Sequence, residues 1–490
     1  MLFNSPGFVF LFLPASLAIF LFLRRRGLLR ASVFALAALS LVFYSWWNPR
    51  FLPILLGSIL LNFYLARAIG AARRSAPRLA RPLLASGVGF NLVVLGYFKY
   101  ANFLDDNLAR FALPHFALAP IALPLGISFF TFQKIAFLVD VHRGRAGEVR
   151  LWDYALLMSF YPQLIAGPIM HHSELLPQLD AGSARPRADD LRLGFTIFVL
   201  GLAKKVLVAD PIAAFADPAF GAVALGGSLD ATSAWTAALS YTAQLYFDFS
   251  GYSDMAIGLG LLFGIRLPIN FNSPYKATSI IDFWRRWHIT LSRFLRDYLY
   301  VGLGGNRRGT FRRYLNLSIT MVLGGLWHGA GWTFLVWGAL HGACLIVNHL
   351  WRALANGAAT SVAGKALSWS VTFLVVVVGW VFFRSAGVGA ALRLLQSMAG
   401  NGGLNPQTQS GFPTGLCLAL VLIAVAAVAP NTQEIVGYQG PRGDFAGEPA
   451  SPSRSPTWGP TRRWAVAAGL IFAASIGTFS RISQFIYFQF

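Results

Sequence analysis

Apolar segments long enough to cross a membrane recur along nearly the whole chain. A transmembrane helix needs about 20 consecutive apolar residues. Segments of this kind lie near residues 8–23, 28–47, 51–69, 83–103, 118–139, 151–169, 191–209, 233–263, 315–351, 367–383, 412–430 and 464–480. The range 315–351 is long enough for two helices. The pattern predicts an all-α polytopic integral membrane protein, with one transmembrane domain over residues 1–490 and no large soluble domain.

The composition supports a membrane protein and argues against a nucleic-acid partner. The chain is 56% hydrophobic and 12% charged, whereas soluble domains carry about 25% charged residues. Its 40 Lys and Arg residues outnumber 19 Asp and Glu residues, which gives a net charge of +21. Because no basic stretch lies outside a loop beside an apolar segment, these residues are expected to face a membrane surface rather than a phosphate backbone.

The distribution of Lys and Arg among the short loops predicts the orientation of the chain. Loops 24–30 and 67–82 are basic, while residues 48–50 between them are nearly uncharged. Because basic loops tend to stay in the cytoplasm, we expect the N-terminus outside and the first apolar run retained as a span. The same count places the basic loop 140–150 inside and the acidic stretch 210–232 outside.

Successive loops alternate between the two sides of the membrane, so an odd number of spans must separate loop 140–150, inside, from stretch 210–232, outside. Two complete spans between them would break this alternation. The turn-rich stretch 160–168 is therefore predicted to be re-entrant. Irregular backbone at membrane depth is tolerated only where protein or a water-filled cavity surrounds it, so this stretch indicates a cavity. The Gly-, Pro- and Ser-rich range 431–462 is expected to form a surface loop.

The segment 264–314 is predicted to lie on the cytoplasmic side, because it carries ten basic and two acidic residues. Within it, residues 281–300 have the periodicity of an amphipathic helix. Asp282 stands four residues before Arg286, the spacing of a helical ion pair. A basic amphipathic helix commonly lies in the membrane interface, and the tryptophans of this one also suit packing around a buried site.

Among the eight histidines, His328 is the strongest candidate for catalysis. It lies within an apolar run and is flanked by several glycines. An ionisable residue inside the membrane is costly and usually faces a cavity or pathway. His288, on the aromatic side of the predicted amphipathic helix, is the second candidate. Neutral histidine both accepts and donates a proton near pH 7, which suits general-base catalysis on a hydroxyl.

The remaining histidines have structural or solvated interpretations. Three lie at predicted span ends: His115, His142 and His349. His341 has small neighbours at helical spacing and is expected to make an interhelical hydrogen bond. His171 and His172 are also expected to be structural or solvated. Adjacent histidines cannot easily share one face of a helix, so no metal site is expected there.

Motifs of several other chemistries are absent from the sequence. It contains no GxSxG nucleophile elbow, no GxxxxGK[ST] phosphate loop and no HExxH zinc motif. The HxxxxD pattern of many soluble acyltransferases is missing, because Arg293 and Thr333 stand five residues after His288 and His328. The two cysteines lie in apolar stretches without CxxC spacing, so neither a disulfide framework nor a cysteine metal site is expected.

Several segments together resemble the membrane-bound O-acyltransferase family, in its bacterial alginate O-acetyltransferase branch. The matching segments are residues 160–169, 246–254, 270–275, 282–292, 297–300, 304–306, 324–329 and 485–490. The likeness therefore runs over most of the chain. It implies a fold with about 11–13 membrane helices, in which re-entrant and interfacial helices surround a central tunnel joining the two membrane faces.

The resemblance also implies roles for particular residues. His328 would be the catalytic histidine, and His288 a second site residue on the cytoplasmic helix. The residues expected to bind the donor or substrate are Asn270, Trp284, Arg285, Arg286, Trp287, Ser292 and Trp327. No metal and no tightly bound cofactor is expected. The donor would be acetyl-CoA or another acyl thioester, whose negative charge the basic segment would attract.

The implied acceptor is an extracytoplasmic, alginate-like polysaccharide, reached directly or through a periplasmic acetyltransferase partner. The protein would then be a multi-pass protein of the bacterial inner membrane, in contact with lipids. Close relatives of that branch also acetylate cellulose or peptidoglycan, and others transfer D-alanine toward teichoic acid. Further alternatives are a structural subunit of a synthase complex and a transporter or flippase subunit for polysaccharide export. A transporter would be expected to show inverted repeats, which the sequence lacks.

Overall fold

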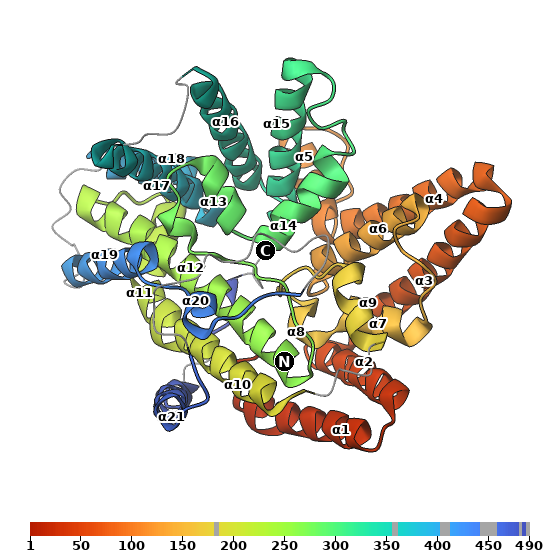
Figure 1. Ribbon diagram of the computed structural model, residues 1–490. Helices are drawn as coiled ribbons and strands as arrows, with labels where there is room; N and C mark the ends of the chain where they lie inside the picture. The colour runs from red at the N-terminus through yellow and green to blue at the C-terminus, as the bar shows by residue number, and fades with distance from the viewer. Residues whose placement is uncertain (181–185, 355–360, 402–411, 442–457, 480–482, 487–490) are drawn as a thin grey trace.

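The computed structural model describes residues 1–490 except 181–185, 355–360, 402–411, 442–457, 480–482 and 487–490, and every element in this part is a helix (Figure 1). The all-α prediction is therefore confirmed. The first elements are η1 (Gly7–Phe12), α1 (Leu13–Arg25), α2 (Leu29–Ser45), η2 (Pro49–Phe51), α3 (Leu52–Ser75) and α4 (Pro77–Leu95). Helix α4 continues through the π-helix η3 (Gly96–Tyr100) into α5 (Ala101–Arg110).

The predicted span over 118–139 is wrong in its first half. Residues 111–126 are irregular, and helix α6 begins only at Ile127 and ends at Arg143 (Ile127–Arg143). The irregular stretch contains Pro114, Pro120 and Pro124. Each of these prolines lacks the backbone N–H that a continuous helix would use.

The predicted segment 151–169 forms two short helices, α7 (Leu151–Ser159) and α8 (Tyr161–Leu164), instead of one long helix. Phe160 interrupts them with a ψ of 109°. Residues 154–170 are buried throughout. Neither helix is long enough to cross a bilayer, which agrees with a re-entrant element. Helix α9 (His172–Asp180) follows.

Helix α12 (Ala231–Leu262) lies near the centre of the molecule and is buried along almost its whole length (Figure 1). It packs against α10 (Ala188–Ala203) through two pairs of glycines. A Cβ added at Gly201 would lie 2.6 Å from the carbonyl oxygen of Gly251, and one at Gly258 would lie 2.5 Å from that of Gly194. Only glycine permits this direct contact between two helix backbones.

The acidic stretch 210–232, predicted to be a loop, is mostly helical. Helix α10 continues through the π-helix η4 (Lys204–Ala209) into α11 (Asp210–Ala224). Two of its acidic residues are paired: Asp210 lies 2.7 Å from the ammonium of Lys205, and Asp217 lies 2.8 Å from the guanidinium of Arg384.

The predicted amphipathic helix over 281–300 is broken into three pieces. The 3₁₀-helix η5 (Pro274–Lys276) precedes them, and the pieces are α13 (Ile280–Arg286), α14 (Ile289–Phe294) and the π-helix η6 (Leu295–Tyr300). The break lies at Trp287 and His288, where His288 has a φ of 44°. The predicted ion pair is confirmed, because Nε of Arg286 donates to Oδ1 of Asp282 at 2.9 Å.

The range 315–351 forms two helices, as predicted. These are α15 (Gly309–His328) and α16 (Trp332–Leu354), which lie side by side (Figure 1). The remaining helices are α17 (Val362–Arg384), α18 (Val388–Met398), α19 (Phe412–Val428), α20 (Thr432–Val436) and α21 (Arg462–Ile476). Helix α20 lies inside the predicted surface loop 431–462, of which residues 442–457 fall outside the described residues. Of the segment 485–490, residues 487–490 also fall outside them.

Five helices in the described residues are long and apolar enough to span a membrane. They are Gly7–Arg25, Pro49–Ser75, Pro77–Arg110, Trp332–Leu354 and Val362–Arg384. Two shorter apolar helices are Leu29–Ser45 and Pro413–Val428. The larger number of membrane helices expected from the resemblance stays a prediction.

Candidate active site

His328 is the last residue of helix α15 and is 4% exposed. The helix ends there because Gly329 adopts an extended conformation with a φ of −160°. Just before the end, α15 packs closely on α16, since a Cβ at Gly325 would lie well inside contact distance of the carbonyl oxygen of Phe334. Gly325, one helical turn before His328, thus serves helix packing, and this close packing fixes the position of the last turn that carries His328.

Two polar side chains from η3 hold the end of α15. Nζ of Lys99 donates to the carbonyl oxygens of Trp327 and His328, the latter at 3.2 Å, and to Oγ of Ser128 at 3.1 Å. The hydroxyl of Tyr100 donates to the carbonyl oxygen of Leu326 at 2.7 Å. These carbonyls have no partner further along the helix, and a cation at a helix C-terminus interacts favourably with its dipole.

The sequence interpretation missed Lys99 as a site residue. The signal was present, because Lys99 is a charged residue inside the apolar run 83–103, and charged residues at membrane depth usually have a functional role.

His288 occupies the break between α13 and α14. Its ring Nδ1 donates to Oδ1 of Asn270 at 3.1 Å. The same oxygen accepts a hydrogen bond from the hydroxyl of Thr290 at 3.0 Å. The backbone carbonyl of Asn270 accepts the N–H of Ile289 at 3.0 Å. Asn270 is fully buried, so it holds both the ring of His288 and the first turn of α14.

The two candidate histidines lie close together among aromatic rings. The ring centroids of His288 and His328 are 6.4 Å apart. Trp327 lies 6.2 Å from His288, and its indole N–H donates to the carbonyl oxygen of Ser128 at 3.4 Å. On the other side, the rings of Trp337 and Phe383 lie 5.1 and 5.2 Å from that of His328. The fold therefore brings together residues about 40 positions apart in the sequence.

A pocket of about 100 Å³ reaches His328. Lys99, Trp47, Trp327 and residues 123–129 also line it. Trp47 belongs to the nearly uncharged connection between α2 and α3. We call this the first pocket.

A second pocket lies where α6, α9 and α14 meet. Its lining includes Thr290 and Arg293 of α14, together with residues 169–172. The hydroxyl of Thr290 accepts a hydrogen bond from the N–H of Ile169 at 3.0 Å, which ties the buried stretch after α8 to α14. The second pocket is thus two residues away from His288 along the chain.

The other predicted donor-binding residues separate into two groups. Trp287 is buried 4.8 Å from the ring of Trp380, and Trp284 lies 5.7 Å from the ring of Trp337, so both belong to the aromatic cluster around His328. The hydroxyl of Ser292 donates to the carbonyl oxygen of Trp287 at 3.4 Å. By contrast, Arg285 is exposed and Arg286 is engaged by Asp282. Neither arginine is among the residues that line the two pockets.

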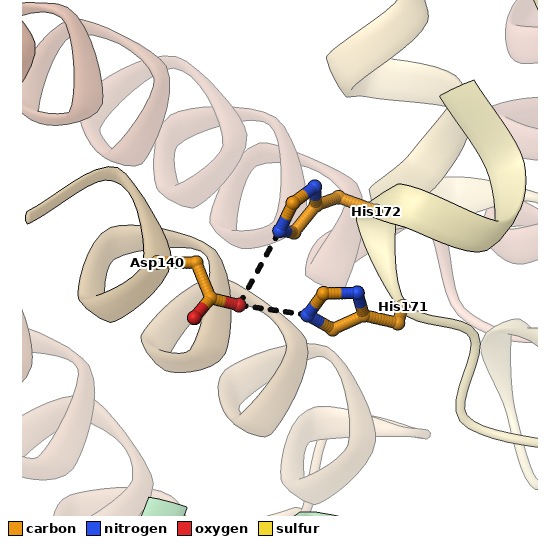
Figure 2. A group of neighbouring side chains, drawn as sticks. All are labelled: Asp140, His171 and His172. Carbon is orange, nitrogen blue, oxygen red and sulfur yellow. Dashed lines mark hydrogen bonds and ion pairs between the residues drawn. The ribbon is translucent and has the colours of Figure 1, made fainter. Parts of the chain in front are cut away.

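The remaining histidines differ in their surroundings. His341 is fully buried 4.8 Å from the ring of Trp337. The predicted hydrogen bond is wrong for His341, because neither ring nitrogen has a hydrogen-bond partner among the described residues. His349 contacts the guanidinium of Arg313 at 3.0 Å, and His115 is exposed. His171 and His172 both approach Asp140 beside the second pocket (Figure 2).

The amino-acid sequence is similar to one known family and to several known proteins. The sequence profile of the membrane-bound O-acyltransferase family, MBOAT, matches residues 141–390, which include both candidate histidines. The chain is 42% identical to the probable alginate O-acetylase AlgI of Pseudomonas aeruginosa, over 100% of both chains. It is 44% identical to the peptidoglycan O-acetyltransferase of Helicobacter pylori, over 83% of this chain and 81% of that protein. A teichoic acid D-alanyltransferase of Streptococcus thermophilus is 29% identical over 46% of this chain and 57% of that protein.

Proposed function

The chain belongs to the membrane-bound O-acyltransferase family and is a multi-pass membrane O-acyltransferase, and we propose that it moves an acetyl group from a cytoplasmic thioester to a hydroxyl outside the cytoplasm. The contact between His328 and the first pocket carries this proposal. The donor is acetyl-CoA or another acetyl thioester. The protein lies in the bacterial inner membrane with its N-terminus outside.

The proposed reaction uses His328 as the general base. Its imidazole takes the proton from the acceptor hydroxyl while the hydroxyl oxygen attacks the thioester carbonyl. A C–O bond forms, the C–S bond breaks, and the leaving thiolate takes up the proton held by His328. General-base assistance of this kind contributes about 10²- to 10⁴-fold to the rate. We favour direct transfer over an acyl-enzyme, because the sequence offers no activated serine or cysteine nucleophile.

We assign His288 a positioning role beside His328, because the centroids of the two rings are 6.4 Å apart. Its Nδ1 donates to Asn270 at 3.1 Å, so in the neutral ring Nε2 is left as an acceptor. A ring held in this way is suited to orienting the acceptor hydroxyl rather than to taking its proton.

The positions of the two pockets support a route for each substrate. The first pocket is bordered by Trp47, in a connection that the charge pattern places outside. The second pocket is bordered by the middle of α6, at Gln133, Ala136 and Phe137, and α6 leads into the basic loop 140–150. We therefore assign the acceptor to the first pocket and the anionic donor to the second, and the tunnel implied by the family would connect them near His288.

The proposed acceptor is an alginate-like polysaccharide, acetylated directly or through a periplasmic acetyltransferase partner. The full-length likeness to the probable alginate O-acetylase supports this class. The likeness to a peptidoglycan O-acetyltransferase supports peptidoglycan as a second candidate. Labelled product recovered from each polymer in parallel reactions with membrane vesicles distinguishes the two.

The test uses purified protein in liposomes with radiolabelled acetyl-CoA and an acceptor polymer. His328→Ala is expected to lose at least 100-fold of the transfer rate, while its melting temperature stays near that of the wild type. His349→Gln is the matched control, because His349 lies on the neighbouring helix α16 and contacts Arg313 rather than either pocket. A folded His328→Ala protein with wild-type transfer would refute the assignment of the base.

A further inference from the structure

Three side chains suited to metal ligation meet at the edge of the second pocket, away from His328. They are Asp140 near the end of α6 and the adjacent pair His171 and His172 at the start of α9 (Figure 2). Among the described residues this is the one group in which three such donor atoms lie within 4.8 Å of one another. Asp140 is fully buried, and His172 is 7% exposed.

Both imidazoles point the same ring nitrogen at one carboxylate oxygen. Nε2 of His171 lies 2.7 Å from Oδ2 of Asp140, and Nε2 of His172 lies 3.3 Å from the same oxygen. The sequence interpretation excluded a shared site because neighbours on a helix diverge. The structure differs because His171 precedes the first residue of α9, so the two side chains do not follow helical geometry.

Hydrogen bonding alone leaves this group unsatisfied. Nε2 of His172 lies 3.3 Å from Oδ2 of Asp140 without the geometry of a hydrogen bond, and within the described part of the chain neither this nitrogen nor Oδ1 of Asp140 has a hydrogen-bond partner, although both atoms are buried. A buried polar atom without a partner costs roughly 1–3 kcal/mol. Meanwhile Oδ2 of Asp140 is approached by three groups, since the hydroxyl of Tyr298 also contacts it. A cation bound between Oδ2 and the two imidazole nitrogens would bring these three atoms together as its ligands.

We propose that Asp140, His171 and His172 bind a divalent transition-metal cation, of which zinc fits best. Two imidazoles and one carboxylate, with a fourth position left open, form a common zinc ligand set. Ligands about 2.0–2.2 Å from a tetrahedral zinc ion are roughly 3.3–3.6 Å apart. The separation of His172 from Asp140, at 3.3 Å, lies at the lower end of this range. His171, now 2.7 Å from Asp140, has to move outward by roughly 0.6–0.9 Å.

The surroundings complete the site. Nδ1 of His171 lies 2.7 Å from Oγ of Ser173 and accepts the backbone N–H of Ser173 at 3.3 Å. With a cation on Nε2, the proton of the neutral ring would stand on Nδ1, and Oγ of Ser173 would accept it, which is the usual outer partner of a metal-bound histidine. The hydroxyl of Tyr298 donates to Asp140 in the same role. The nearby cation Arg293 is paired with Glu174 at 3.0 Å, so its charge is largely offset. His171 and His172 both line the second pocket, and the bound cation would join α6 to the start of α9.

The test measures zinc directly and does not depend on acyl transfer. Full-length protein with a histidine-free affinity tag is purified in detergent, stripped with a chelator and titrated with zinc. The wild type is expected to bind about one zinc per chain, seen by elemental analysis, with a higher melting temperature. Cobalt(II) in the same site is expected to give the strong visible absorption of tetrahedral coordination.

The variants identify the ligands. Asp140→Asn and His172→Gln keep side-chain size and are each expected to weaken zinc binding at least 100-fold. His115→Gln, an exposed histidine in another loop, is expected to bind as the wild type does. Zinc retained by both ligand variants, or no zinc bound by the wild type at micromolar concentration, overturns the proposal in favour of a hydrogen-bonded cluster. If either variant fails to fold, the cobalt spectrum of the wild type decides.

Discussion

Replacement of Lys99 by methionine is expected to reduce catalysis more than it reduces stability. Lys99 holds the last two carbonyl groups of α15 and also contacts Ser128. Hydrogen bonds from a charged donor are worth roughly 1.5–3 kcal/mol each, and a cation at a helix C-terminus adds up to about 2 kcal/mol. The removal of a partly buried ammonium offsets part of this loss, so a net cost of about 1–3 kcal/mol is expected.

The larger consequence concerns His328, whose own carbonyl group is one of the acceptors. A displacement of about 1 Å at a catalytic group costs roughly 100-fold in rate. Lys99→Met is therefore expected to lower kcat for acetyl transfer by about 10- to 100-fold with a smaller change in KM for the thioester. The assay measures initial rates with labelled acetyl-CoA, normalised to folded protein from a thermal melt.

Lys134→Met is the matched control for this experiment. Lys134 is fully buried, donates to the hydroxyl of Ser58 at 2.8 Å and lies 4.1 Å from the ring centre of Phe130. In the part of the chain that the structure describes, these contacts lie away from α15, and Lys134 lines neither the first nor the second pocket. The control is expected to lose similar stability but to keep kcat per folded molecule. Wild-type kcat in folded Lys99→Met, or an equal loss in both variants, would refute the positioning role.

Two further substitutions test the site and the helix packing around it. Asn270→Ala removes the acceptor that orients His288 and is expected to lower kcat about tenfold or more. Asn270→Asp keeps an acceptor oxygen and is expected to recover part of the rate. Equal rates in Asn270→Ala and the wild type would contradict this. Gly325→Ala places a methyl group against the carbonyl oxygen of Phe334 and is expected to destabilise the protein by at least about 2 kcal/mol. In Gly89→Ala the new methyl group meets no atom within 4 Å, so this control is expected to stabilise its helix slightly. Thermal melts of both variants check this.

The sequence predicted the helical class and the pairing of Asp282 with Arg286, because both follow from local spacing. It predicted two helices over 315–351 for the same reason. The expected continuous helix over 281–300 was wrong, because apolar periodicity does not register the left-handed backbone at His288. That conformation is held by Asn270, which lies 18 residues earlier and is joined to the ring at 3.1 Å.

The candidate site was only partly predictable. His328 and His288 stood out as ionisable residues in apolar or aromatic surroundings, and the fold brings their rings within 6.4 Å. The contact of Lys99 with the end of α15 joins residues 228 positions apart in the sequence. The convergence of His171 and His172 on Asp140 depends on where α9 begins. Such long-range contacts have no periodic signal in the sequence.

The glycine contacts between α10 and α12 also limit how the protein moves. Where Gly201 meets Gly251 and Gly258 meets Gly194, no side chain stands between the two backbones that could change rotamer and let the helices slide. The pair is expected to behave as one rigid body. Movements that admit a donor or release a product then fall to the interrupted segments, at Phe160 between α7 and α8 and at His288 between α13 and α14. One of these joints is itself a candidate catalytic histidine, so opening and chemistry are expected to be coupled at the same residue.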